Sequence, residues 1–347
     1  MAASDAFDAL DALLGAAAPA GPAARHLADW TLALGTGAAA IFAIAMAALW
    51  LALRRAGAAA AARARSGERA EDAEDAAASL SAAAQRSARR WIVAGGLVLP
   101  LVVLVPLFFA SVAGTARLQA PPPPGALQIG ITARMWWWEV RYADPEGGGA
   151  IVTANEVHIP AGRPVRLGLV SADVIHSFWV AALGGKRDAV PGRVTHLVIE
   201  ADQPGTWRGQ CAEYCGDQHA RMAITVVAHE PAAFERWLAA QRAPAAADAA
   251  PGSAAARGRA AFLASGCVAC HRIGGVGGGG TPTRGPDLTH VAGRRTLGAG
   301  QRSNSEAALR EWIAGVQHIK PGARMPSFAH LDAGTLDALA AYLWTLR

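Results

Sequence analysis

The sequence predicts a multidomain, membrane-anchored protein with a two-helix transmembrane hairpin, a β-sandwich domain and a small all-α domain. Three observations support this prediction. Two long uncharged segments lie in the first third of the 347-residue chain. Several short strand-like segments follow, separated by Gly, Pro, Asp and Asn turns. The last part, residues 257–347, combines helical patterns with a glycine-rich loop.

The two uncharged segments have the length of membrane spans. Trp30–Leu53 holds 24 residues and Trp91–Ala116 holds 26, without a charge in either, whereas a bilayer core needs about 20. Pro100 and Pro106 in the second segment are tolerated in membrane helices. Two buried helices of a soluble domain are the alternative, and such long uncharged runs fit it poorly. We therefore expect a transmembrane hairpin over residues 30–117.

Charge predicts the orientation of this hairpin. The segment between the spans, residues 54–90, contains eight arginines, at positions 54, 55, 63, 65, 69, 86, 89 and 90. The positive-inside rule places this loop in the cytoplasm. Residues 1–29 carry no basic n-region of a signal peptide and are expected to be an exported tail. Everything after Arg117 is then periplasmic, outside the inner membrane of the cell.

The exported part is expected to contain two domains. Strand-like segments closed by a helical one predict a β-sandwich over residues 118–242; they cover residues 127–142, 151–160, 164–172, 195–201, 222–229 and 231–242. Residues 243–256 are rich in Ala and Pro and are expected to form a flexible linker. Residues 257–347 form the small helical domain. The net charge of +5 does not indicate nucleic-acid binding, because the basic residues form no stripe interleaved with aromatics.

The helical domain carries a haem attachment signature. Cys267, Cys270 and His271 form a C-x-x-C-H motif, in which both thiols add to haem vinyl groups and the histidine binds iron. A thioether is a suitable second axial ligand, and Met325 is the only methionine after His271. We therefore expect Met325 to bind the iron. The competing histidines, each more typical of a surface position, are His290, His318 and His330.

The second cysteine pair lies in a donor-rich loop. Cys211, Cys215, His219 and Met222 offer two thiolates, an imidazole and a thioether within twelve positions. A disulfide is the default for a cysteine pair in an exported protein, and zinc would accept the cysteines and the histidine. The thioether, however, favours copper.

A copper site in this loop requires one more histidine. A mononuclear blue copper site uses one cysteine and two histidines, so the additional cysteine allows both sulfurs to bridge two copper ions. His176, at the end of a strand-like segment, is the best candidate for the missing ligand. His158 and His196 are the alternatives, although a lone histidine is more often structural.

These motifs resemble two known families. CVACH, GPDLTH and MPSF, followed by a terminal helix, resemble a class I cytochrome c over residues 257–347. The resemblance implies that Pro286 lies against the haem and that the terminal helix packs on the first one. The pattern C-x-E-x-C-x3-H-x2-M, preceded by MWWWEVRY, DVIHSF and GGKRDAVPGR, resembles the copper A cupredoxin domain of cytochrome c oxidase subunit II. With the two spans, this second resemblance covers residues 30–240.

The second resemblance implies a role for each residue of the loop. Cys211 and Cys215 would bridge the coppers, His176 and His219 would each bind one, Met222 would bind weakly, and Glu213 would supply its backbone carbonyl. The Glu213 carboxylate would reach a magnesium ion shared with subunit I. Trp136 would be the aromatic through which electrons enter copper A; a strand-face anchor is its alternative. A glutamate that the family often carries at the start of the second helix is absent here, where the sequence is WIVAGG.

The resemblance implies an electron-accepting subunit of a membrane cytochrome c oxidase. Electrons would pass from a donor through haem c to dinuclear copper A, and on to the haem-copper centre of subunit I, where oxygen is reduced to water and protons are pumped. The implied partners are subunit I and other integral oxidase subunits, the lipid bilayer, and a donor that is either a soluble cytochrome c or a reductase complex.

Charge is consistent with docking of the two exported domains. Residues 257–347 hold eleven basic and five acidic residues, and residues 118–238 hold ten and twelve; opposite net charges favour association. Two other functions stay open at this point. One is the copper A subunit of a nitric oxide reductase, and the other is a non-catalytic, membrane-anchored copper-binding protein. Quinol oxidase subunits lack the copper ligands present here.

Overall fold

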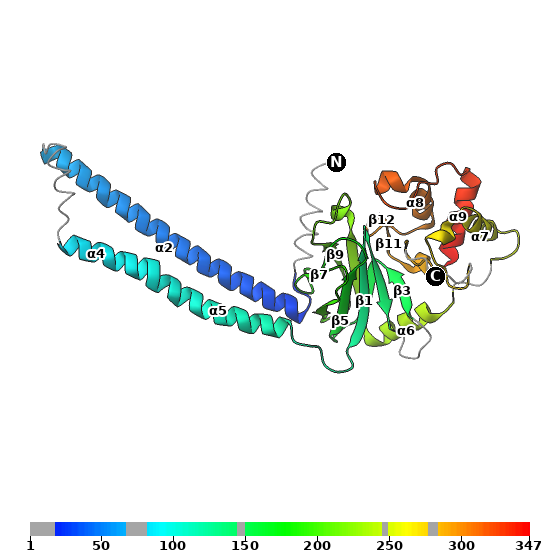
Figure 1. Ribbon diagram of the computed structural model, residues 1–347, viewed down its shortest axis with the longest axis horizontal. Helices are drawn as coiled ribbons and strands as arrows, with labels where there is room; N and C mark the ends of the chain where they lie inside the picture. Colours follow the sequence, from blue (N-terminus) through cyan, green and yellow to red (C-terminus); the bar gives the residue numbers. More distant parts are fainter. Residues whose placement is uncertain (1–17, 67–81, 144–149, 245–248, 277–283) are drawn as a thin grey trace. The chain divides into compact units, whose positions relative to one another are not determined.

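The computed structural model describes residues 18–66, 82–143, 150–244, 249–276 and 284–347. The first part of the expected exported tail, the middle of the arginine-rich loop with Arg69, and part of the glycine-rich loop lie outside the described residues. The chain forms two compact units (Figure 1). One is Ala28–Ala120, and the other combines the segment up to Leu27 with Pro121–Arg347.

The first unit consists of two long apolar helical stretches. Helix α2 runs over Pro22–Ser66, and the second stretch consists of α4 (Ala82–Val93), a π-helical segment (Ala94–Val98) and α5 (Leu99–Leu118). Both are long and apolar enough to cross a membrane. Large side chains such as those of Phe42 and Phe109 are exposed, an arrangement that is stable only against lipid or another apolar partner. The helices anchor the chain in the membrane.

The bounds of these helices differ from the sequence expectation. Helix α2 begins at Pro22 and not at Trp30, because proline is suited to the first position of a helix, where its missing N–H has no partner in any case. In the second stretch, Pro100 has no N–H to donate to the carbonyl of Gly96, and the wider π-helical turn lies at that point.

The second unit contains a β-sandwich of two five-stranded sheets (Figure 1). The first sheet has the order β3-β2-β1-β5-β8 and the second β4-β10-β9-β6-β7. The strands are β1 Leu127–Arg134, β2 Trp137–Tyr142, β3 Ile151–Ala154, β4 Glu156–Pro160, β5 Val165–Ser171, β6 His176–Trp179, β7 Arg187–Ala189, β8 Thr195–Ile199, β9 Gly205–Cys211 and β10 Ala223–His229.

Alternation of side chains builds the core between the sheets. Along β5, buried residues alternate with half-exposed ones, as expected for a strand with one face in the core. Trp138, Tyr142 and Phe178 are among the largest fully buried side chains. Helix α6, Pro231–Arg242, adds Phe234 and Leu238 to the same core. The cupredoxin-like β-sandwich expected from the sequence is confirmed.

One sequence expectation within the sandwich is wrong. The segment 127–142 was expected to be a single strand-like run, but it forms the antiparallel pair β1 and β2. The chain turns at Met135 and Trp136. Trp136 therefore lies in the turn at one end of the sheet and is not an anchor on a strand face.

The described residues before the first helix belong to the sandwich. The Ala20 N–H donates to the Ala182 carbonyl at 2.8 Å, and the Ala20 carbonyl accepts from the Asp202 N–H at 2.9 Å. Arg25, in the first turn of α2, forms an ion pair with Asp202. This part of the expected tail is thus held against the sandwich by hydrogen bonds.

The C-terminal domain is helical, as expected. It contains α7 (Ala254–Ala264), α8 (Glu306–Ile319), α9 (Ala333–Thr345) and the short strand pair β11 (Thr296–Leu297) and β12 (Arg302–Ser303). Helix α7 begins inside the expected linker, because the Ser253 hydroxyl caps it by accepting the Ala256 N–H at 3.1 Å.

Helices α7 and α9 pack closely through a glycine. A Cβ atom on Gly258 would lie 1.9 Å from the Ala338 carbonyl oxygen, so only glycine allows the two helices to approach this closely. Phe262 and Tyr342 meet edge to face beside it, with ring centroids 5.9 Å apart. This pair of helices forms one wall of the cavity described below.

Candidate metal centre and cofactor cavity

Three neighbouring strands of the second sheet bring the donor residues together. Strand β9 ends at Cys211, and β10 begins at Ala223, so the donor loop connects two adjacent antiparallel strands. Strand β6 lies on the other side of β9 and begins at His176. The loop is closed by two backbone hydrogen bonds of 2.9 Å, from Cys211 to the Met222 carbonyl and from Ala212 to the Ser177 carbonyl.

The donor atoms of this loop face one another. The Cys211 and Cys215 sulfurs are 3.8 Å apart. His176 Nδ1 lies 3.8 Å from Cys211 Sγ, and His219 Nδ1 lies 3.6 Å from Cys215 Sγ. The Met222 thioether is 4.0 Å from Cys215 Sγ. Each cysteine therefore has one histidine beside it.

The backbone of Glu213 completes the cluster. Its carbonyl oxygen lies 3.3 Å from Cys211 Sγ. All four cysteines of the chain lie within the described residues, and all four are free. The structure thus brings together all six residues that the sequence indicated. The alternative histidine His158 lies elsewhere, 2.8 Å from a ring nitrogen of His229.

The two thiols differ in acidity. The hydrogen bond with Cys215 lowers the pKa of Cys211, which favours the thiolate form of this cysteine. The same hydrogen bond raises the pKa of the Cys215 thiol, because two thiolates in contact repel each other. A cation that binds both sulfurs removes this repulsion, and metal binding would release the second proton.

Asp173 orients His176 and was missed by the sequence analysis. Its carboxylate lies 2.8 Å from His176 Nε2 and accepts backbone N–H groups from Met135 and Val174 at 2.8 and 2.9 Å. Burial opposes ionisation of Asp173, but these hydrogen bonds lower its pKa overall. A carboxylate behind a ligating histidine fixes which ring nitrogen faces the metal; here Nδ1 faces the sulfurs. The spacing D-x-x-H was the available signal.

Trp136 contacts the donor loop directly. Its indole N–H donates to the Cys215 carbonyl oxygen at 2.8 Å. Gly216 makes room for the ring, since a Cβ there would lie 3.2 Å from Trp136 Cζ2, and its φ of 106° favours glycine. The turn between β1 and β2 thus places this tryptophan against the backbone of a cysteine donor.

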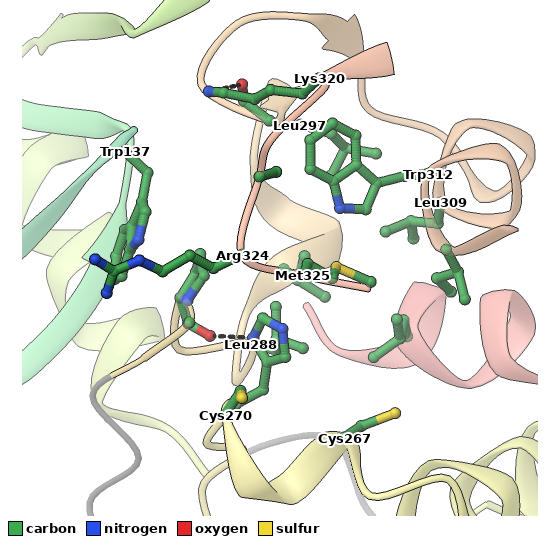
Figure 2. Close-up of a pocket in the computed structure, with 18 of the residues that line it drawn as sticks. Trp137, Cys267, Cys270, Leu288, Leu297, Leu309, Trp312, Lys320, Arg324 and Met325 are labelled. Carbon is green, nitrogen blue, oxygen red and sulfur yellow. Dashed lines mark hydrogen bonds between the residues drawn. The ribbon is translucent and has the colours of Figure 1, made fainter. Parts of the chain in front are cut away.

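A cavity of about 600 Å³ lies in the C-terminal domain beside this turn, within the usual range of about 300–1,000 Å³ for cofactor sites. Cys267, Cys270, His271 and Met325 all line it. Figure 2 shows Met325 between the two cysteines and Trp312. The competing histidines His290, His318 and His330 are not among the described lining residues.

The walls of the cavity fit a haem. Pro286 lines it as expected, and its carbonyl oxygen lies 2.8 Å from His271 Nδ1, which leaves the other ring nitrogen for a metal. Burial lowers the pKa of His271 and so favours the neutral imidazole that binds iron. Arg294 Nε and Thr296 Oγ1 are buried in the same wall and have no hydrogen-bond partner among the described residues. Such polar atoms suit the carboxylates of a haem, because an unsatisfied buried donor is costly.

The cavity and the donor loop meet at Trp136. Met135, Trp136 and Trp137 come from the sandwich, yet they line the cavity together with the residues of the haem motif. Figure 2 shows Trp137 and Arg324 on the same side of the cavity. A single tryptophan therefore contacts both candidate sites.

The fold and the sites define a class of protein, namely a membrane-anchored cupredoxin joined to a C-terminal cytochrome c domain. Comparisons with known proteins agree with this class. The family model described as cytochrome c oxidase subunit II, periplasmic domain, matches residues 145–229, and the model described as cytochrome c matches residues 255–347.

Comparisons with individual proteins name one subunit. Cytochrome c oxidase subunit 2 of Alkalihalophilus pseudofirmus is 34% identical over 255 residues, covering 72% of this chain and 71% of that protein. The subunit 2 of Bacillus sp. (strain PS3) is 28% identical, covering 72% of each. A crystal structure of the periplasmic domain of cytochrome oxidase subunit II from Bradyrhizobium japonicum is 31% identical, covering 35% of this chain and 97% of that one, with a TM-score of 0.33. The chain belongs to the cytochrome c oxidase subunit II family, and it is thus a subunit of an oxidoreductase complex.

Proposed function

We propose that this chain passes electrons from a donor through a haem c to a dinuclear copper A centre, and on to the haem-copper centre of a separate subunit I. There oxygen would be reduced to water, coupled to proton pumping. Trp136 carries the proposal, because it lines the haem cavity and its indole N–H meets the carbonyl of Cys215. The two metal groups supply one-electron exchange, and the residues of the chain hold them at fixed positions.

The cluster of donor atoms supports a set of copper ligands. Cys211 and Cys215 would bridge two copper ions, and His176 and His219 would each bind one. Met222 would be a weak ligand, and Glu213 would contribute its carbonyl oxygen. Soft sulfur donors with imidazoles favour copper. Because Cys211, Cys215, Met222 and His176 are buried and Asp173 holds His176, we expect the same ligand geometry in both redox states.

The lining of the cavity supports a set of haem ligands. Cys267 and Cys270 would form the thioether links, His271 and Met325 would be the axial ligands, and Arg294 with Thr296 would receive a carboxylate. Glu213 has a second proposed role. Its half-buried side chain would reach a magnesium ion at the contact with subunit I.

The orientation in the membrane is also a proposal. The arginine-rich loop between the helices favours the cytoplasm, and both exported domains would then lie on the periplasmic side. The attachment of Ala20 to the sandwich supports this, because a hairpin of two spans returns the chain to the side from which it started. The donor would be a soluble cytochrome c or a reductase complex that meets the C-terminal domain.

Substitution of one bridging thiol tests the proposed path. In the purified oxidase complex, Cys215→Ser should leave the haem reducible by the donor but abolish oxygen consumption, because the electron has no copper acceptor. Asp217→Ser changes an exposed side chain of the same loop and should keep wild-type turnover. Oxygen consumption by Cys215→Ser at the wild-type rate would contradict the proposal. Turnover of nitric oxide in place of oxygen would assign the complex to nitric oxide reduction.

A further inference from the structure

Two buried charged side chains, Lys320 and Glu156, cross the contact between the C-terminal domain and the sandwich in opposite directions. Lys320, just after α8, reaches toward the sandwich, and Glu156 on β4 reaches toward the C-terminal domain. They are 3% and 1% exposed, respectively. A Glu156 carboxylate oxygen accepts the backbone N–H groups of Arg295 and Thr296 at 2.6 and 3.2 Å.

The ammonium of Lys320 has three acceptors. It donates to the carbonyl oxygens of Trp136, Arg221 and Gly298 at 2.7, 2.9 and 3.0 Å. The first two belong to the sandwich and the third to the C-terminal domain. An ammonium has three N–H donors, so each donor has one carbonyl. A planar guanidinium presents its donors in a fork and does not match this arrangement. Lys320 is one of only two lysines among the 32 basic residues of the chain.

The carbonyls that Lys320 contacts flank the donor loop. Trp136 donates its indole N–H to the Cys215 carbonyl, and Arg221 directly precedes Met222. On the other side, Lys320 lines the haem cavity in which Met325 lies. The Gln317 side chain holds this segment by donating to the carbonyls of Ala323 and Met325 at 2.7 and 2.6 Å. The Lys320 side chain thus links the Met325 segment to the Trp136 turn. Figure 2 shows Lys320 and Met325 among the residues that line the cavity.

Uncharged hydrogen bonds also hold the two domains together. Ala223 N–H donates to the Ala299 carbonyl at 3.2 Å, and the Gln301 side chain donates to the Arg221 carbonyl at 3.3 Å. The Arg221 guanidinium, an exposed charged donor, also donates to the Ile319 carbonyl at 3.2 Å. Burial of an ammonium, in contrast, costs free energy, and it lowers the pKa of Lys320 to about 7. A buried charge is therefore weak evidence for a stabilising role.

We propose that Lys320 is a positioning residue that fixes the orientation of the C-terminal domain on the sandwich, so that the haem cavity faces Trp136. This inference rests on the electron path proposed above. Lys320 acts by holding the backbone of the Trp136 turn and of the donor loop against the segment that carries Met325.

The test compares Lys320→Met and Lys320→Arg with wild type, in the full chain in detergent, loaded with haem and copper. Arg310→Met is the matched control, because it removes one charge from α8 and breaks an exposed ion pair with Asp337, a kind of contact that contributes little to stability. Transfer from photoreduced haem to copper is followed optically. We expect both Lys320 variants to slow this electron transfer by at least about tenfold, because a small displacement of the reacting groups lowers the rate strongly. The haem and copper spectra should be unchanged.

A second readout follows docking without electron transfer. Three backbone N–H groups form hydrogen bonds across the contact between the two domains, those of Ala223, Arg295 and Thr296. They should exchange faster with solvent in Lys320→Met and at the wild-type rate in Arg310→Met. Wild-type transfer and exchange rates in Lys320→Met would overturn the inference. So would a wild-type transfer rate in Lys320→Arg, because charge alone would then suffice.

A measurement on the wild-type protein keeps the inference testable if Lys320→Met does not mature. With only two lysines, a chain labelled with ¹⁵N-lysine gives two side-chain signals, and Lys186→Met assigns them. In the fully reduced protein below pH 7, we expect Lys320 to give an ammonium signal that exchanges slowly with water. Fast exchange would overturn the inference. Absence of any haem-to-copper transfer in wild type would instead contradict the proposed function.

Discussion

The indole N–H of Trp136 donates a hydrogen bond of 2.8 Å to the carbonyl oxygen of Cys215. Trp136 also lines the cavity, together with the residues of the C-x-x-C-H motif. This arrangement gives a short route from one candidate site to the other through one side chain and one hydrogen bond. The route arises because β1 and β2 form a hairpin whose turn faces both the loop after β9 and the C-terminal domain.

Trp136→Phe should slow electron transfer from haem to copper, because phenylalanine keeps an aromatic ring but has no N–H for the Cys215 carbonyl. We expect a decrease of roughly tenfold, comparable to other losses of a positioned contact, with unchanged copper and haem spectra. Transient absorption of the full chain measures the rate. Trp207→Phe, a similar substitution on β9, should have no effect. An unchanged rate in Trp136→Phe would show that the electron takes another route.

Asp173→Asn should weaken copper binding, because the carboxylate holds His176 at 2.8 Å. Loss of such an outer partner typically costs about 10–100-fold in metal affinity. Competition with a chelator measures the affinity, and the copper hyperfine pattern should change as well. The control is Asp188→Asn, which alters an exposed carboxylate on β7 of the same sheet. Equal copper retention in both variants would show that Asp173 does not contribute to copper binding.

Gly258→Ala should destabilise the C-terminal domain, because the added methyl group would meet the Ala338 carbonyl. Overpacking of this kind costs about 1–3 kcal/mol, and we expect a lower melting temperature and less covalently attached haem. Gly293→Ala places its methyl group in open space and should behave as wild type. A Gly258→Ala variant with wild-type haem content and melting temperature would contradict the observed contact of α7 with α9.

The stability of the sandwich should decrease in mild acid because of His229. Burial and the nearby His158 and Arg295 lower its pKa from 6.5 to about 4; Glu156, 3.4 Å from His158, also faces this cluster. The unfolded chain takes up a proton near pH 6.5 and the folded chain does not, so stability is lost as the pH falls from 6.5 toward 4.

Calorimetry at about pH 7 and about pH 5 tests this expectation against the ordinary histidine pKa. The melting temperature of His229→Gln should fall less than that of wild type between the two pH values, because glutamine takes up no proton. His196→Gln, an exposed substitution on β8, should follow wild type. Equal falls in wild type and His229→Gln would exclude His229 as the cause.

The sequence predicted the features that depend on local order. The two apolar helices, the sandwich and the helical C-terminal domain were expected, because hydrophobic pattern and turn residues determine them. The copper site could also be predicted, because five of its six candidate ligands lie within twelve positions of the donor loop. His176 was found only because a copper site needed it, and Asp173 was missed although it lies three residues away.

The contacts between the domains could not be predicted in this way. Lys320 and Trp136 are 184 positions apart, and no periodicity relates them. The split of residues 127–142 into two strands at Trp136 was missed for a related reason, since three consecutive tryptophans favour a continuous strand. Such features depend on packing between distant segments, and only the folded chain reveals them.

We expect this one chain to hold two redox centres, a dinuclear copper and a haem c. Electron paramagnetic resonance and optical spectra of the full chain, matured with haem and loaded with copper, test it most directly. We predict a seven-line mixed-valence copper signal beside the bands of a low-spin c-type haem. A four-line mononuclear copper signal, or a Cys211 to Cys215 disulfide that excludes copper, would contradict it.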